Sequence, residues 1–404
     1  MSWKTIKMGE VAISIQPGPF GSQLHSSDYS SEGTPIIMPK DMVDGRISHA
    51  DLLFVSDEHV KRLSRHQVHP GNLMVARKGD VRKCVYISEN EDGWMTGSDC
   101  LKVALNEESC FPRFIYYQLR SPYIGKWLET ISIGATMPSL NSGLLGSIEL
   151  YLPPIEVQER VSSILSVYDD LIETNQRQIK LLEEAAQRLY KEWFVDLRYP
   201  GHENVPVVDG VPNGWKKTVF SERVDVLSGG TPKTSNPEYY NGTIPFYSPK
   251  DSDDRFYAFD TETHISESGL ENCNSKLYPE GTIIITARGT VGKTTILAKP
   301  MAMNQSCYAL RSSQVSSVFF LFFALRQEIL ALKAMANGGV FDTIIVKTFD
   351  RINLTTPSAP VIQAFDKLVT PIMEKMKSLL IENRNLSEAR DRLLPKLMSG
   401  EITV

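Results

Sequence analysis

Four basic residues beside a glycine are the positions in this 404-residue sequence best suited to bind an anion. Arg77, Lys78, Arg82 and Lys83 fall within seven residues on both sides of Gly79. Glycine lets another backbone approach closely, and arginine or lysine beside it can donate to a phosphate oxygen or to a base edge. This run therefore predicts contacts with DNA. The alternative is a solvated charged turn.

A second basic run, from Arg288 to Lys293, has the composition of a nucleotide-binding loop but not its spacing. The pattern GxxxxGK[ST] requires glycine where this chain has Ala287, and it requires a helix where residues 294–297 (TTIL) favour a strand. We therefore interpret Arg288 and Lys293 as counterparts of the first run. Their chemistry is phosphate contact without nucleotide hydrolysis.

Further candidates for DNA contact lie beside glycine turns and in a repeated Pro-Lys-Asp sequence. Residues 19–22 (PFGS) and 228–232 (SGGTP) are glycine turns whose polar neighbours can donate to phosphate or to base edges. These neighbours are Ser22, Gln23, Thr231 and Lys233. Lys40 and Lys250 occupy the Pro-Lys-Asp repeats, where they either contact phosphate or pair with Asp41 and Asp251.

The sequence shows no catalytic or metal-binding constellation. Residues 236–239 (NPEY) resemble the Asn-Pro-Pro-Tyr/Phe motif of amino-methyltransferases, but Glu238 replaces the second proline, and neither half has a glycine-rich cofactor loop. The five cysteines form no CxxC pair, and no HExxH occurs among the seven histidines. We predict a binding protein with no catalytic residues and no metal.

Composition sets limits on the class of protein. The chain is 42% hydrophobic and 23% charged, which is typical of two or three globular domains. No apolar run approaches the roughly 20 residues of a membrane span, and the first residues do not resemble a secretory signal. We expect a cytoplasmic protein with reduced cysteines. Since the net charge is −5, any DNA contact must come from local concentrations of cations.

The order of motifs shows that the sequence contains two copies of one pattern. Trp3-Lys4 recurs as Trp215-Lys216, and Pro39-Lys40-Asp41 recurs as Pro249-Lys250-Asp251. Residues 70–77, which end in Arg77, match residues 280–288, which end in Arg288. Such ordered self-similarity predicts two similar domains.

Each copy ends in a long segment with apolar residues at intervals of three and four. The apolar positions are Val157, Val161, Ile164, Tyr168, Leu171, Ile179, Leu182, Ala186, Leu189 and Trp193, then Val361, Phe365, Leu368, Ile372, Met376, Leu379, Leu386 and Leu393. This spacing predicts two helices of roughly 35 to 40 residues, about 55 Å long. We expect them to pair as a coiled coil. Asn175 and Asn383 would fix the register, or lie solvated at the edge of the stripe.

We therefore predict an α+β protein with an internal pseudo-two-fold repeat. Two similar mixed α/β lobes are separated by two long helices packed as an antiparallel coiled coil. The predicted boundaries are 1–154 for the first lobe, 155–198 for the first helix, 199–214 for a linker, 215–359 for the second lobe and 360–404 for the second helix and C-terminal tail.

Three segments of the long helices and their ends carry a family resemblance. They are residues 152–158 (LPPIEVQ), 189–194 (LYKEWF) and 392–402 (RLLPKLMSGEI). Together with the repeat and the glycine turns, they make the chain resemble the DNA-specificity (S) subunit of Type I restriction-modification systems over essentially its whole length.

The resemblance implies a non-catalytic role in phage defence. Each lobe would be a target-recognition domain for one half of a bipartite, asymmetric site in double-stranded DNA. The helices would set the gap and dock two modification (methyltransferase) subunits. The partner subunits would bring S-adenosylmethionine, ATP and magnesium, including the ATP-dependent restriction subunits, and this chain would bind no cofactor. A self-sufficient DNA adenine methyltransferase and a protein-only scaffold are the alternatives.

Overall fold

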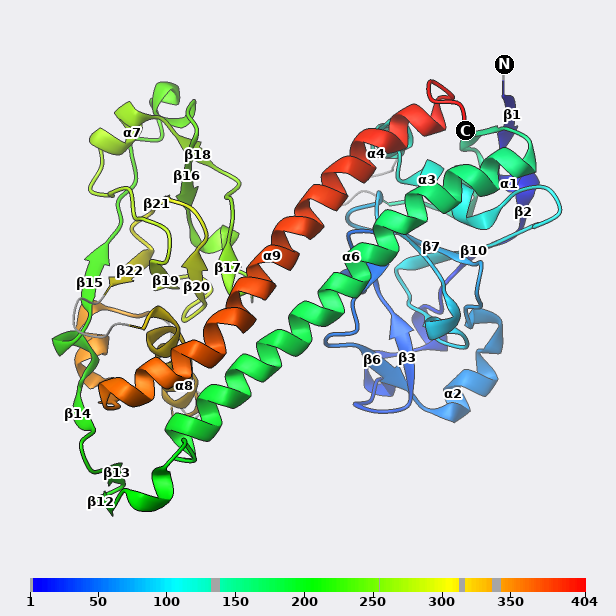
Figure 1. Ribbon diagram of the computed structural model, residues 1–404. Helices are drawn as coiled ribbons and strands as arrows, with labels where there is room; N and C mark the ends of the chain where they lie inside the picture. Colours follow the sequence, from blue (N-terminus) through cyan, green and yellow to red (C-terminus); the bar gives the residue numbers. More distant parts are fainter. Residues whose placement is uncertain (1–2, 132–138, 254, 312–316, 336–342) are drawn as a thin grey trace. The chain divides into compact units, whose positions relative to one another are not determined.

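The computed structural model describes residues 3–131, 139–253, 255–311, 317–335 and 343–404. The chain divides into two compact units. The first unit comprises Met1–Glu173 and Arg384–Val404, and the second comprises Thr174–Asn383. Each unit combines one mixed α/β lobe with stretches of two long helices, α6 (Ile155–Tyr190) and α9 (Ala359–Met398) (Figure 1).

The first lobe is built on two small sheets. The four-stranded antiparallel sheet has the order β2 (Ala12–Pro17), β10 (Cys100–Leu105), β7 (Leu73–Ala76), β8 (Cys84–Tyr86). The three-stranded sheet has the order β6 (Leu53–Val55), β3 (Thr34–Ile37), β9 (Met95–Thr96). The helices are α1 (Met8–Val11), α2 (Asp57–Arg62), α3 (Pro112–Leu119), α4 (Pro122–Ile131) and α5 (Ser142–Gly146). The hairpin β4 (Met42–Val43) and β5 (Arg46–Ile47) follows β3.

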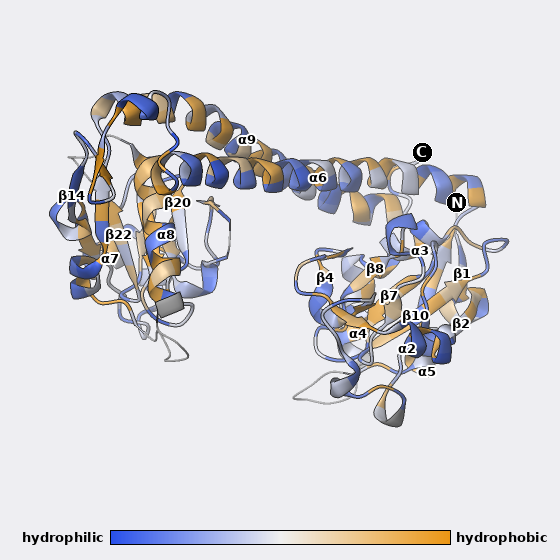
Figure 2. Cartoon of the chain, turned by 90° about the horizontal axis from the view of Figure 1, so that it is seen from below, coloured by the Kyte–Doolittle hydropathy of each residue, from blue (hydrophilic) through white to orange (hydrophobic). Residues whose placement is uncertain are grey.

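The second lobe repeats this plan. Its larger sheet has the order β15 (Asp225–Ser228), β22 (Cys307–Arg311), β19 (Ile283–Thr286), β20 (Thr294–Leu297), β17 (Tyr257–Ala258). Its smaller sheet has the order β18 (His264–Ile265), β16 (Ile244–Tyr247), β21 (Ala302–Met303). The helices are α7 (Glu267–Glu271) and α8 (Val318–Met335). Figure 2 shows α8 as largely hydrophobic, as expected for a helix packed into a core.

A short strand pair closes each lobe next to a long helix. β1 (Lys4–Lys7) pairs antiparallel with β11 (Glu149–Leu152), and β14 (Lys216–Val219) pairs in the same way with β23 (Asn353–Thr356). The entry and the exit of each lobe are therefore adjacent. Between the copies, the predicted linker contains a small hairpin of β12 (Val207–Val208) and β13 (Val211–Pro212).

The two long helices run antiparallel within each unit, as predicted. In the first unit, Val161 near the start of α6 shares a hydrophobic cluster with Leu394 near the end of α9. In the second unit, Tyr190 at the end of α6 packs against Phe365 near the start of α9, with ring centroids 6.3 Å apart. The helices contain 36 and 40 residues, which agrees with the predicted lengths. No helix in the described part of the chain is long and apolar enough to cross a membrane.

The predicted apolar stripe is wrong at two positions. Leu171 and Leu368 are 42% and 48% exposed, whereas the next residues, Ile172 and Val369, are buried. Each pair consists of two adjacent apolar residues, and a spacing of three and four fits either member equally well. The choice is made by contacts with the opposite helix, which the sequence alone does not contain.

A buried ion pair that the sequence analysis missed joins both helices to the first lobe. Asp169 of α6 accepts a hydrogen bond of 2.7 Å from Arg390 of α9 and one of 2.6 Å from the hydroxyl of Tyr117 in α3. Arg46 of β5 donates to the backbone carbonyl of Asp169. The side chains of Asp169 and Arg390 are only 10% and 7% exposed. This cluster holds two helices and two lobe elements in one arrangement.

The two asparagines proposed to fix register differ in their surroundings. Asn175 is only 5% exposed, and its Nδ2 has no hydrogen-bond partner among the residues that the structure describes. Asn383 lies in α9 and is half-buried. The alternative of a solvated Asn175 is therefore wrong. The role of the pair in register stays a prediction.

Candidate nucleic-acid interface

In each lobe, the predicted glycine turn and the hairpin turn lie at the same end of the strands of the larger sheet. In the first lobe, β2 and β7 both run antiparallel to β10, with Pro17 opposite Leu101 and Ala76 opposite Cys100. Their carboxyl ends therefore point the same way, and the turns that follow them are neighbours. The second lobe has the same register at Ser228–Tyr308 and Thr286–Cys307.

The basic runs form hairpin turns of identical length and flanking strand register in the two lobes. Residues 77–83 connect β7 to β8, and residues 287–293 connect β19 to β20. The backbone N–H of Ala76 donates to the carbonyl of Lys83 at 2.9 Å, and that of Thr286 donates to Lys293 at 2.9 Å. Gly79 and Gly289, the third residues of the turns, both have φ of +79°. The backbones of the two turns differ at the sixth residue, where Gly292 has φ of +79° and Arg82 does not have a positive φ.

This register corrects the sequence alignment of the two copies. Arg288 occupies the place of Lys78, whereas the residue at the place of Arg77 is Ala287. Arg77 and Ala287 make matching backbone hydrogen bonds of 2.7 Å, to Asp99 and Ser306 respectively. The sequence match was shifted by one residue because both segments contain a single arginine close to the same glycine.

The two hairpin glycines leave open space for another backbone. A side chain at Gly79 would meet no atom within 4 Å, and at Gly289 the nearest atom would be Cβ of Pro249 at 3.6 Å. A φ of +79° disfavours other residue types, which explains glycine at both positions. The tips of both turns are therefore accessible to a nucleic-acid backbone.

The Pro-Lys-Asp turns lie against these hairpins. Lys83 donates through Nζ to the carbonyl of Pro39 at 3.0 Å, and Thr290 donates through Oγ1 to the carbonyl of Pro249 at 3.3 Å. Lys40 and Lys250, the middle residues of these turns, are both exposed. The structure thus brings the predicted lysines and hairpin residues together on one surface of each lobe.

In the first lobe, carboxylates of the protein already pair with most of the exposed cations. Lys78 lies 3.0 Å from Asp99, and Arg82 lies 3.0 Å from Asp80 and 3.3 Å from Glu129. The hydrogen bond from Arg82 lowers the pKa of Asp80. Any phosphate that binds here must compete with these carboxylates.

Lys40 also has protein contacts. Its ammonium donates to the backbone carbonyl of Asp51 at 2.7 Å and lies 3.8 Å from the Asp41 carboxylate. In the first lobe, Lys40 therefore does form the ion pair with Asp41 that was the alternative to phosphate contact, although the distance is long for such a pair. Burial raises the pKa of Asp41, which is 2% exposed, so this carboxylate belongs to the fold of the turn.

An aromatic residue that the sequence analysis did not single out supports Arg77. The guanidinium of Arg77 lies over the ring of Phe20, 5.4 Å from its centroid, and Phe20 is 54% exposed. This stacking joins the glycine turn to the hairpin. Gln23 is half-buried, and Ser22 lies in the 3-10 turn Gly21–Gln23, but its side chain is outside the described set.

The second lobe presents its cations differently. Lys233, Lys250 and Arg288 are exposed, and none makes a side-chain hydrogen bond or ion pair within the described part of the chain. Lys250 therefore does not pair with Asp251, contrary to the alternative. Thr231 donates to the side chain of Gln305, and Lys293 is half-buried. The two lobes thus offer unlike surfaces on the same framework.

A comparison with known families finds one match for each copy of the repeat. The family model of the Type I restriction modification DNA specificity domain matches residues 2–184 and 212–386, one segment for each copy. This chain belongs to that family. Specificity subunits recognise DNA and are not catalytic, so the alternative of a self-sufficient methyltransferase is excluded. The chain acts with the other subunits of a restriction-modification system.

Individual relatives extend over the same length. The HindI specificity subunit of Haemophilus influenzae is 26% identical and is matched over 99% of both chains. The MjaIX specificity subunit of Methanocaldococcus jannaschii is also 26% identical, over 99% of this chain and 93% of its own. The S subunit crystal structure from M. genitalium has the same fold, with a TM-score of 0.60, 15% identity, and coverage of 98% and 96%.

The exposed hairpin arginine gives a direct test of this specificity-subunit surface. Arg288→Ala is expected to weaken specific DNA binding. Loss of a bidentate contact with guanine would cost about 1 to 3 kcal/mol and would relax the base preference at one position of the site. If Arg288 contacts phosphate, affinity falls for all sequences and the salt slope decreases by about one. Arg77→Ala is expected to behave in the same way in the first lobe. The measurement is a binding titration at several salt concentrations.

Arg311→Ala is the matched control for Arg288. Arg311 is exposed and is the last residue of β22, so it lies at the end of the strands opposite to the turns. We expect it to leave both affinity and salt slope unchanged. Unaltered affinity and slope in the Arg77 and Arg288 variants would assign those arginines to the fold instead.

Proposed function

We propose that each lobe reads one half of a two-part, asymmetric site in double-stranded DNA with the surface formed by its glycine, Pro-Lys-Asp and hairpin turns. The observation that carries this proposal is the pair of hairpin turns with the same length and strand register and different side chains. Arg77 stacks on Phe20 in one turn, and its place is taken by Ala287 in the other. Two lobes with similar turns but different side chains are expected to recognise two different half-site sequences.

The long helices are proposed to set the gap between half-sites and to dock two modification (methyltransferase) subunits. Apolar residues that remain uncovered on both helices support docking. Outside the helix seam, Val167 and Leu171 are 55% and 42% exposed on α6 in the first unit, and Leu368 is 48% exposed on α9 in the second. Exposed apolar surface of this kind marks protein interaction sites.

Cofactors are proposed to reside on the partners. S-adenosylmethionine would be carried by the modification subunits, and ATP and magnesium by the restriction subunits, with none bound by this chain. The assembled complex would act in the cytoplasm, where its DNA substrate lies.

The complete system tests the proposal through the methylation pattern that it leaves on DNA. A methylome of cells that carry all subunits is expected to show one motif of two unlike parts, separated by a fixed number of unread base pairs. A control strain that lacks this chain is expected to lose that motif. One continuous motif, or a palindromic one, would contradict two different reading lobes.

A further inference from the structure

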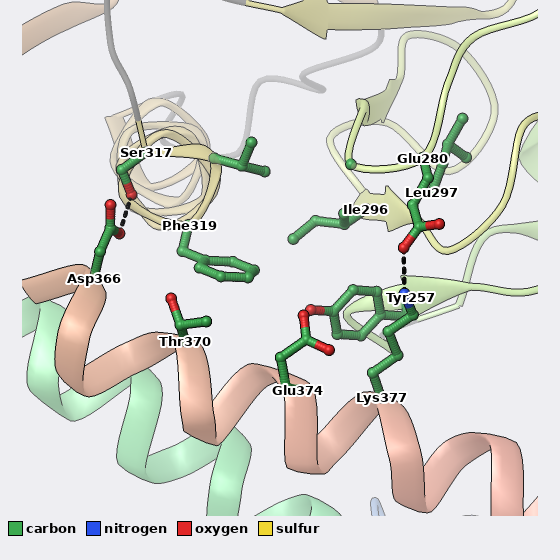
Figure 3. Close-up of a pocket in the computed structure, with 12 residues that line it drawn as sticks. Tyr257, Glu280, Ile296, Leu297, Ser317, Phe319, Asp366, Thr370, Glu374 and Lys377 are labelled. Atoms are coloured by element: carbon green, nitrogen blue, oxygen red, sulfur yellow. Dashed lines mark hydrogen bonds and ion pairs between the residues drawn. The ribbon is translucent and has the colours of Figure 1, made fainter.

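A cavity of about 300 Å³ opens beside α9 in the second unit. Its lining comes from one face of α9, the start of α8 and the strands β17 and β20 (Figure 3). Asp366, Thr370, Glu374 and Lys377 project into it at helical spacing. None of the residues assigned above to DNA contact lines this cavity.

The cavity carries an excess of negative charge. Asp366, Glu374 and Glu280 supply three carboxylates, and Lys377, which bonds to Glu280, supplies the single cation among the lining residues. Ser317 donates to Asp366. Glu374 has no ion pair within the described part of the chain. The cavity is therefore unsuited to DNA phosphate and suited to a cation.

An unpartnered tyrosine side chain gives independent evidence that a ligand group belongs here. Tyr257 is only 5% exposed, and its hydroxyl has no hydrogen-bond partner among the residues described. Figure 3 shows its ring projecting into the cavity toward Glu374. Burial and the charges of Glu374 and Glu280 raise its pKa, so the hydroxyl stays neutral. The hydroxyl oxygen is not among the enclosed polar atoms of the protein, so it is the part of this side chain that a ligand in the cavity can reach.

The remaining walls are apolar. Ile296 and Leu297 of β20 and Phe319 of α8 line the side opposite the carboxylates of α9 (Figure 3). Such walls fit the methylene stem of a long basic side chain. The carboxylates fit its charged end, which the rings of Tyr257 and Phe319 can also contact through cation–π interactions. Burial raises the pKa of Asp366, as expected for a carboxyl group without a nearby cation.

We propose that this cavity receives the charged end of one lysine or arginine side chain from a modification subunit docked on α9. The inference rests on the proposed docking function of the helices. The volume is at the lower limit for small-molecule sites, so a single side chain fits it better than a whole metabolite. The cavity also opens on a helix with uncovered apolar surface at Leu368.

The affinity of the full chain for its modification subunit tests the proposal. Glu374→Gln keeps the shape of the side chain and removes its charge, and it is expected to weaken binding at least about tenfold. Tyr257→Phe removes only the hydroxyl and is expected to weaken binding roughly two- to tenfold. Glu382→Gln is the matched control, because Glu382 is exposed on α9 and does not line the cavity. It is expected to change affinity less than about twofold.

Three outcomes distinguish failure of the cavity proposal from failure of the docking function. If the unmodified chain binds the modification subunit and both cavity variants bind it equally well, the cavity proposal is overturned while the docking function stands. If the unmodified chain does not bind the subunit, the docking function fails, and the cavity proposal fails with it. Spermidine that binds the isolated chain and is lost in Glu374→Gln, with subunit affinity unchanged, would identify a polyamine site and overturn the proposal. Specific DNA binding by the chain alone is expected to be equal in all variants.

Discussion

Replacing Arg390 by alanine is expected to lower the free energy of unfolding of the first unit by about 3 to 5 kcal/mol. The substitution leaves the buried carboxylate of Asp169 without its cation, and an uncompensated buried charge is costly. Equilibrium unfolding in urea measures the effect. Three of the five tryptophans, Trp3, Trp94 and Trp127, lie in the first unit, so fluorescence follows its transition together with that of the second unit, which holds Trp193 and Trp215.

Arg392→Ala provides the control on the same helix. Arg392 is 77% exposed and pairs with Glu388 one turn away. Its loss is expected to cost no more than about 1 kcal/mol, because exposed pairs contribute little. Equal effects of the two substitutions would show that the pair of Asp169 and Arg390 does not act as a buried ion pair.

Lengthening the helix pair is expected to change the gap in the DNA site and leave both half-site sequences unchanged. Asp169 contacts Arg390, so one heptad further along α6 and back along α9 reaches Gln176 and Asn383. Four residues inserted at both positions add about 6 Å. At roughly 3.4 Å per base pair, the favoured gap should grow by one or two base pairs. Selection of bound sites from a random DNA library measures it.

The control for this experiment adds the same length where no change is expected. Four residues inserted at Asp209 and Gly210 extend the turn between β12 and β13 and leave both helices intact. The favoured gap should then stay as it was. New half-sites with an unaltered gap in the helix variant would show that the helices do not set the spacing.

The fold was predictable from the sequence where the pattern was long or repeated. The two copies, the strand 294–297 and the antiparallel helices all follow from motif order, residue type and periodicity. The burial of Asp169 and Arg390 was not predictable, because charged residues are placed on exposed faces unless a partner is known. That partner lies more than 200 positions away in the sequence.

The turns of the candidate site were predictable from the sequence, but the contacts of their side chains were not. Gly79 and the cations around it stand out by type and spacing. The contacts of Lys78 with Asp99 and of Arg77 with Phe20 depend on which strands are neighbours in the sheet. The cavity beside Tyr257 gave no sequence signal, because its carboxylates come from segments nearly 90 residues apart.

The shared length and strand register of the two hairpin turns make one of them transplantable into the other lobe. Residues 77–83 and 287–293 have the same length, the same flanking strand register and a glycine of the same φ at the third position. Transplanting the second-lobe loop into the first lobe should therefore leave the sheet intact and move the reading chemistry alone. The reverse exchange would place Arg82 at the position of Gly292, where a Cβ would lie 2.7 Å from Cγ2 of Ile329. New target preferences could be assembled from such loops without rebuilding either core, provided that the third residue remains glycine and that a loop placed in the second lobe keeps the glycine at position 292.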